Sequence, residues 1–476
     1  MLRKLAHNTL IGLGGTVLHK VLAFATTLVL ARGLGQEGFG IYSFVGVYIF
    51  FFTFLVDLGM ERVVTREISR TPKDSPQIIG NAILLKLGLC ALVVPATYGV
   101  AFGLGVPADT RWCILIAALG LPLSIDSVLR SFFQSRFEVR YIFAVTLPSS
   151  ALFLALVAGC VWLHLPVRSV FYAQLLNGVI TVAVLLAITL RYLRPSLHVR
   201  PEMMKSLLRD AGEVGLFVLM FMLAMRLDQI LLYQLSGADE VGRYAIGVRV
   251  TEALSILPET LMMTVFPLLA SSQHSHPERF REVYRLSFKY LATIVLPVAL
   301  ALTLARDEMI ELFFGSAYQS SGVPLVILAW GMFFAYTGAV YLNLFIVQSL
   351  QRLMLTVSLA ALIANIAINL WLIPKYGASG AAAATVLANL VGFMFWVLHP
   401  ATAPSMAVCL RETLRPLLSV LGAGGVVWVL HLGSGMGVVV ALGSYVVLLS
   451  ALGGLNLGDV ALVRSLFATE HAAPAS

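Results

Sequence analysis

The sequence predicts an all-α, polytopic membrane protein with about fourteen transmembrane helices. Of its 476 residues, 59% are hydrophobic and only 12% are charged, whereas charged residues make up about 25% of ordinary globular chains. The mean hydropathy is +0.91, and apolar runs long enough to cross a bilayer, roughly 20 residues, recur along the whole chain. Long continuous runs favour helices over a barrel, whose strands alternate over segments of about ten residues.

Polar or glycine-containing breaks separate the fourteen runs. The runs lie approximately at 9–31, 41–60, 78–104, 112–131, 141–163, 169–190, 212–235, 244–270, 286–305, 323–348, 353–373, 379–398, 416–432 and 436–456. The first run is expected to be a retained span rather than a cleaved signal peptide. It is as long as a full crossing, contains His19 and Lys20, and lacks a small-residue cleavage site at a suitable place.

A short pattern occurs twice, 202 residues apart, each time in a break between two apolar runs. Its members are Gly35, Glu37, Gly40 and Tyr42 in LGQEGFGIY, then Gly237, Asp239, Gly242 and Tyr244 in SGADEVGRY. The chain is therefore predicted to be duplicated, its repeating unit being two crossings joined by a short turn that glycine bends. Duplicated helical bundles are a common architecture of transporters.

Basic residues indicate the orientation, because lysine and arginine in short loops stay on the cytoplasmic side. One set of connections holds 22 of the 32 basic residues and the opposite set holds six. An even number of crossings with both termini cytoplasmic fits this distribution. The net charge of +8 then reflects topology and attraction to anionic lipid headgroups, and nucleic acid is not an expected partner.

Several function classes are disfavoured by what the connections contain. No connection exceeds about twenty residues, so no extramembrane domain is expected. The chain has no Gly-rich phosphate loop ending in Gly-Lys-Ser/Thr, which a pump driven by its own nucleotide hydrolysis would need. The four cysteines lack close ligand spacings. We expect no cofactor and no metal site.

Ionisable residues inside the spans are the functional candidates, because each costs roughly 2.5–3.5 kcal/mol to insert unless it faces a cavity or a partner. They are Lys20, Asp57, Lys86, Asp126, Arg130, Arg226, Asp228, Arg249, Glu252 and Glu259. Span one contains no acid beside Lys20, so this lysine is predicted to contact substrate or an ion pair within a cavity. Lys86 is expected either to line a cavity or to extend to the cytoplasmic surface.

The remaining in-span charges leave alternatives open. The set Arg226, Asp228, Arg249 and Glu252 can hold spans seven and eight together as ion pairs, or Arg226 or Arg249 can contact an anionic substrate. Asp57 corresponds to Glu259 under the 202-residue offset, and each can bind a coupling proton or sodium ion or hydrogen-bond a neighbouring span. Asp126 and Arg130, one helical turn apart, are predicted to pair.

These residues lie within a series of motifs that resembles a known family. In order, the motifs are LARGLGQEGFGIY, DLGMERVVTREISR, RSFFQSRFE, RLDQILLYQLSGADEVGRYAIGVRVTEAL, FFGSAYQSSG and IPKYGASGAAAAT. Their order and spacing are similar to those of polysaccharide-biosynthesis (O-antigen type) flippases in the multidrug/oligosaccharidyl-lipid/polysaccharide exporter superfamily. The resemblance covers nearly the whole chain.

The resemblance implies two pseudo-symmetric six-helix lobes, 1–195 and 196–400, followed by two accessory helices and a cytoplasmic tail in 401–476. It implies alternating-access transport of polyprenyl-pyrophosphate-linked oligosaccharides from the cytoplasmic to the periplasmic leaflet of a bacterial inner membrane, and no enzymatic activity. Lipids, a proton or sodium ion, a polysaccharide polymerase and glycosyltransferases are the implied partners.

The site residues expected on this basis form two groups. Cations that contact substrate are Lys20, Lys86, Arg226 and Arg249, and acids in ion pairs or a coupling-ion site are Asp57, Asp228, Glu252 and Glu259. Three alternative functions remain. They are an ion-coupled drug/cation antiporter of the same superfamily, a peptidoglycan-precursor flippase, and a membrane polymerase that would depend on Glu308 or Glu311.

Overall fold

The computed structural model describes residues 2–456 and Asp459, and all regular structure in this range is helical, as predicted. The α-helices are α1 (Leu2–Asp57), α2 (Met60–Arg70), α3 (Ser75–Gly103), α4 (Ala108–Ala118), α5 (Ile125–Ser135), α6 (Val139–Trp162), α7 (Arg168–Tyr192), α8 (Pro201–Ser236), α9 (Ala238–Leu254), α10 (Ile256–Ser275), α11 (Pro277–Leu304), α12 (Arg306–Phe314), α13 (Gly322–Val347), α14 (Gln351–Leu398), α15 (Ala403–Val429) and α16 (Ser434–Ala451). Short 3₁₀ helices are η1 (Pro72–Asp74), η2 (Leu121–Ser124) and η3 (Ser316–Ser321). Residues 460–476, assigned above to the cytoplasmic tail, lie outside the described residues.

Each of the fourteen expected ranges overlaps helix, but 112–131 spans the break between α4 and α5, and 244–270 spans the break at Ser255 between α9 and α10. Within the described residues, ten helical segments are long and apolar enough to cross a membrane. Two of them, Gly14–Arg70 with 57 residues and Arg352–Leu398 with 47, have the length of two crossings each. They bend at Gly35 (φ 69°) and Gly377 (φ 52°). The breaks expected at these places are therefore single left-handed glycines within otherwise helical chain.

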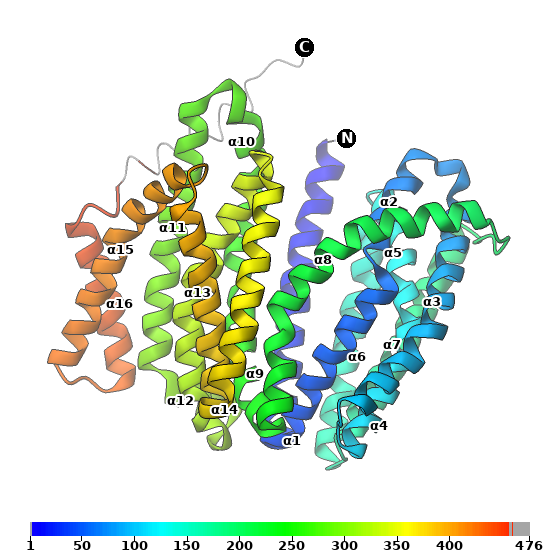
Figure 1. The fold of residues 1–476 in the computed structure, drawn as a ribbon, viewed down its shortest axis with the longest axis horizontal. Coiled ribbons are helices and arrows are strands. Elements are labelled where there is room, and N and C mark those ends of the chain that lie inside the picture. Colours follow the sequence, from blue (N-terminus) through cyan, green and yellow to red (C-terminus); the bar gives the residue numbers. More distant parts are fainter. Residues whose placement is uncertain (1, 457–458, 460–476) are drawn as a thin grey trace. The chain divides into compact units, whose positions relative to one another are not determined.

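The chain divides into two compact units, Met1–Ala245 and Ile246–Ser476. In the first unit, α1 packs along α6, α2 packs on α5, and α6 packs on α7 (Figure 1). In the second unit, α13 packs against both α11 and α14, and α15 pairs with α16. Each unit has its own apolar core, built in the first around the α5 residues Val128, Leu129, Phe132 and Phe133 and in the second around α11 and α13.

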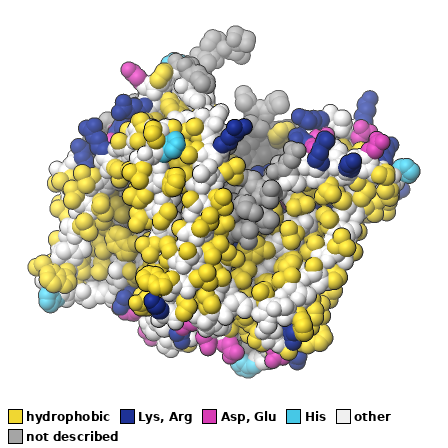
Figure 2. All heavy atoms as spheres, in the orientation of Figure 1, with side chains coloured by type: hydrophobic (Ala, Val, Ile, Leu, Met, Phe, Trp, Pro, Cys, Tyr) yellow, Lys and Arg dark blue, Asp and Glu magenta, His cyan; other side chains and the backbone are white. Residues whose placement is uncertain are grey.

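The outer surface has the character of a lipid-facing protein. Large apolar side chains are exposed along most helices, and Figure 2 shows hydrophobic side chains over most of the visible surface, with charged ones concentrated toward helix ends. Trp162 and Trp428, both near helix termini, are largely exposed, as tryptophans at a membrane interface are. The chain is therefore an all-α, multi-pass membrane protein.

The duplicated motif adopts the same backbone conformation twice. Gly35 has φ 69° and ψ −177°, and Gly237 has φ 87° and ψ 179°, which confirms the predicted glycine-bent turn in both copies. Leu34, before the first bend, and Ser236, before the second, each end a helical stretch. The turn geometry thus follows from the position of one glycine in each copy.

The two copies also contact each other inside the first unit through glycine. A Cβ atom on Gly40 would lie 1.8 Å from the carbonyl oxygen of Ala238, and one on Gly242 would lie 2.2 Å from that of Gln36. The 202-residue offset maps Gly40 onto Gly242 and Gln36 onto Ala238, so the contact is reciprocal. Because both positions lack a side chain, the backbones approach closely, as small residues allow in membrane helices.

Candidate functional site

A cavity of about 580 Å³ with several charged side chains in its lining lies within the first unit. It is bordered by the end of α1, the start of α2, η2 and one face of α5. Its lining residues are Phe50, Thr53, Phe54, Asp57, Gly59, Glu61, Arg62, Ser124, Asp126, Ser127, Arg130 and Gln134. Five charged side chains around one cavity in so apolar a protein make it the candidate site.

Local sequence explains how these side chains converge. On α5, Asp126, Arg130 and Gln134 are spaced i, i+4 and i+8, so they share one face of the helix. At the other wall, α1 ends at Asp57, and the left-handed residues Leu58 (φ 46°) and Gly59 (φ 79°) turn the chain into α2. The apolar side of α2 is buried, and this fixes its first turn at the cavity wall.

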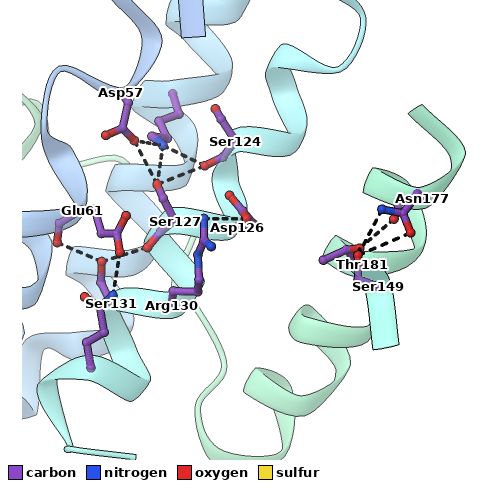
Figure 3. Close-up of polar contacts among 12 residues, drawn as sticks. Asp57, Glu61, Ser124, Asp126, Ser127, Arg130, Ser131, Ser149, Asn177 and Thr181 are labelled. Carbon is purple, nitrogen blue, oxygen red and sulfur yellow. Dashed lines mark hydrogen bonds and ion pairs between the residues drawn. The ribbon is translucent and has the colours of Figure 1, made fainter. Parts of the chain in front are cut away.

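Lys86 of α3 is fully buried and contacts three residues of the cavity lining. Its ammonium group donates to the carboxylate of Asp57, to the carbonyl of Ser124 at 2.8 Å and to the hydroxyl of Ser127 at 2.6 Å (Figure 3). The Ser127 hydroxyl in turn donates to Asp57 Oδ1 at 2.9 Å. The expectation that Lys86 extends to the cytoplasmic surface is thus wrong, because an acid on a neighbouring helix neutralises it within the bundle.

Two further contacts hold the α5 face. Arg130 donates to Asp126 at 2.8 Å, which confirms the predicted pair, and Gln134 donates its amide to Glu61 Oε1 at 2.6 Å. Arg130 Nε is buried and makes no hydrogen bond to the described residues, and the same holds for the hydroxyl of Ser124. Because both atoms have almost no accessible surface, they do not face the cavity, whereas Arg62 of α2 is an exposed cation of the lining.

The other predicted residues of the first unit lie outside this cavity lining. Lys20 is half-buried on α1, and Arg226 is half-buried on α8. Asp228, also on α8, is 5% exposed and accepts hydrogen bonds from the hydroxyl of Tyr244 and from the backbone N–H of Gln229. Asp57 and Lys86 are thus brought together at the cavity, whereas these three are held elsewhere.

In the second unit, the predicted residues lie on both sides of the turn at Ser255. Arg249 pairs with Glu252 at 3.1 Å, one helical turn along α9. Glu259, in the first turn of α10, is exposed and accepts a hydrogen bond of 3.0 Å from Ser255. The residue equivalent to Asp57 by the repeat offset therefore has a more open environment than Asp57 has.

Sequence analysis missed Glu61, Arg62, Gln134 and the two serines as site residues. The i, i+4, i+8 spacing of Asp126, Arg130 and Gln134 was an available signal for one wall. Nothing comparable marked Glu61, whose approach to Gln134 depends on how the chain turns at Leu58 and Gly59.

The fold is shared with solved transporters. A structure of "Lipid II flippase MurJ, inward closed conformation" matches with a TM-score of 0.74 at 12% identity, covering 92% of this chain and 97% of that chain. An inward-facing multidrug resistance MATE family transporter of the MOP superfamily matches with a TM-score of 0.67 at 16% identity, covering 83% and 96%. The chain therefore has the fold of these solved transporters.

Sequence comparison identifies the family of this chain. The family model described as "Polysaccharide biosynthesis protein" matches residues 5–273, and the chain belongs to this family. The model for "Lipid II flippase MurJ" matches residues 142–449. A curated Shigella flexneri protein named "Putative O-antigen transporter" is 22% identical over 397 residues, which are 79% of this chain and 92% of that protein.

Proposed function

We propose that this transporter moves polyprenyl-pyrophosphate-linked oligosaccharides from the cytoplasmic to the periplasmic leaflet for synthesis of a cell-surface polysaccharide. The observation that carries the proposal is membership of the polysaccharide biosynthesis family, joined by the Shigella flexneri relative that matches most of the chain. The setting is a bacterial inner membrane with both termini cytoplasmic, which the distribution of basic residues supports.

The chemistry of such a substrate suits an apolar protein with a few internal cations. The lipid tail remains in the bilayer, while the pyrophosphate needs positive charge and the sugars need hydrogen-bond partners. Lys20, Arg226 and Arg249 are half-buried, and we assign them to the pyrophosphate. Lys86 acts through Asp57 rather than by direct contact, because its own side chain is fully buried.

The architecture proposed for this activity is the duplicated one. It comprises two pseudo-symmetric lobes, 1–195 and 196–400, and an accessory segment, 401–476, working by alternating access. The repeated glycine turns support a duplication. For energy coupling we propose a proton or sodium ion at the acids Asp57, Asp228, Glu252 and Glu259, among which Asp57 borders the cavity.

Leaflet-resolved accessibility of a lipid-linked oligosaccharide tests the proposal. Proteoliposomes with and without this protein, and with no other enzyme, receive the glycolipid in one leaflet, and its appearance in the other is measured. We expect protein-dependent movement of the glycolipid. Absence of movement across several glycan donors, with ion-driven efflux of organic cations instead, would assign the chain to antiport.

A second candidate is a peptidoglycan-precursor flippase, because the lipid II flippase family model matches residues 142–449. Lipid II is therefore the comparison donor in the same assay. Movement of lipid II alone would favour this candidate, whereas preference for the oligosaccharide lipid favours the first.

A further inference from the structure

The cavity of the first unit has two unlike walls. One is aromatic: Phe50 and Phe54 lie four residues apart on α1, with Thr53 between them, and so share a helix face. Phe50 is 40% exposed. The other lining residues supply the carboxylates of Asp57, Glu61 and Asp126, the guanidinium groups of Arg62 and Arg130, and the amide of Gln134. A ligand here meets aromatic rings as well as planar hydrogen-bonding groups.

The charges of the cavity balance. Three carboxylates, Asp57, Glu61 and Asp126, stand against two lining guanidinium groups and the ammonium group of Lys86, which binds Asp57. Asp126 and Arg130 pair with each other. With no net charge, the site offers little attraction to a bare pyrophosphate or to an organic cation, each of which requires a surplus of the opposite sign.

Hydrogen-bonding capacity nevertheless remains in the wall. Arg62 is an exposed cation of the lining, and a carboxylate has about four acceptor positions, of which Asp57 Oδ1 receives the contacts from Lys86 and Ser127. Sugar hydroxyls both donate and accept. The apolar C–H face of a sugar ring suits an aromatic side chain, and a volume of about 580 Å³ lies within the range of small-ligand sites.

We propose that this cavity is a glycan subsite, which binds uncharged, hydroxyl-rich sugar rings of the transported lipid between Phe50/Phe54 and the polar face of α5. The inference rests on the proposed function and adds to it a place for the sugar separate from the cations assigned to the pyrophosphate. The side chains of Gln134 and Arg130 recognise hydroxyls, and Phe54 supports the ring.

Protection of a cysteine in the cavity wall tests the subsite. The variant Thr53→Cys, in a Cys160→Ser background, reacts with N-ethylmaleimide in detergent, and modification is followed by mass spectrometry. The probes are oligosaccharide released by mild acid from the host's lipid-linked pool, inorganic pyrophosphate, and tetraphenylphosphonium. We expect the free oligosaccharide to slow labelling at least fivefold and the other two probes to have no effect.

Matched variants locate the contact. Adding Phe54→Ala or Gln134→Leu is expected to abolish protection, whereas Leu55→Ala, on an exposed neighbouring position of α1, retains it. Protection by pyrophosphate or tetraphenylphosphonium, or no protection by the oligosaccharide, would overturn the inference. Flipping in proteoliposomes is measured separately: flipping without sugar protection refutes the subsite alone, and sugar protection without flipping refutes the proposed function alone.

Discussion

Among the residues whose burial is described, each unit buries one lysine on a long helix, and the two lysines are neutralised in different ways. Lys86 of the first unit binds Asp57, whose side chain is 24% exposed and lines the cavity. Lys289 of the second unit binds Asp459 at 2.5 Å, and there both side chains are less than 10% exposed. Asp459 also lies 3.5 Å from Arg285, which pairs in turn with Glu282 and Glu412.

The two buried lysines have different roles because their acid partners have different surroundings. Both lysines need an acid, because an uncompensated ammonium group in a membrane bundle is costly. In the second unit the acid comes from the segment after α16 and closes the site, so the pair fastens that segment to α11. In the first unit the acid faces open space, so the pair also sets the charge of a binding surface.

Removing each lysine should separate these roles. Lys86→Met leaves Asp57 without its cation and should lower stability by about 3–5 kcal/mol. After Lys289→Met, Asp459 keeps its contact with Arg285, so this variant should lose less stability. Thermal unfolding in detergent measures the loss. Glycolipid export, measured in cells lacking their own transporter, should fall below what the reduced protein level explains only for Lys86→Met.

Neutral pairs are the controls for this comparison. Asp57→Asn with Lys86→Met, and Asp459→Asn with Lys289→Met, remove both charges and should regain most of the lost stability. Export should recover for the second pair only. Full recovery of export by the first pair would mean that Lys86 and Asp57 serve packing alone.

The glycine contact between the repeats should be sensitive to a single methyl group. Gly40→Ala and Gly242→Ala place a Cβ 1.8 Å and 2.2 Å from a carbonyl oxygen, so the helices must separate, at a cost of about 1–3 kcal/mol. Thermal unfolding of both variants in detergent measures this cost.

Gly46→Ala, on α1 like Gly40, is the matched control because nothing lies within 4 Å of its added Cβ. It should be neutral or slightly stabilising, since alanine is favoured over glycine in helices by about 0.5–1 kcal/mol. Equal stability of all three variants would contradict the close contact between the copies.

Replacing Lys20 is expected to have a smaller effect than the changes above, and to alter transport rather than stability. Lys20→Ala should reduce export at least tenfold, corresponding to about 1.4 kcal/mol of lost interaction, at unchanged protein level, and Lys20→Arg should retain part of the activity because it keeps the charge. Export and membrane protein level are measured together. Normal export by the alanine variant would remove Lys20 from the substrate site.

Sequence reasoning reached the helices, the glycine turns and the Asp126–Arg130 pair because each depends on neighbours close in the chain. A bend needs one glycine at φ 69° or 87°, and a pair at i, i+4 needs only the helical period. The Lys86–Asp57 contact joins α3 to α1 and depends on the rotation of both helices, which hydropathy does not specify. The Gln134–Glu61 contact could not be predicted for the same reason. The role of Asp459 was not predicted because this residue lies beyond the last apolar run.

Glu308, an exposed acid of the second unit, gives the smallest expected change in stability. It is a reference against which the buried ion pairs can be compared. The Ser434 hydroxyl donates to Glu308 of α12, and this bond lowers the pKa of the carboxyl below its ordinary value of 4.5. A lowered pKa means that the contact contributes stability above the ordinary value and loses that contribution as pH falls through the lowered one. Ser434→Ala should therefore reduce the melting temperature slightly at pH 7 and have no effect once Glu308 is protonated in both proteins. Melting curves of the two proteins between pH 3 and pH 7 check this, and a difference that grows as pH falls would contradict the assigned bond.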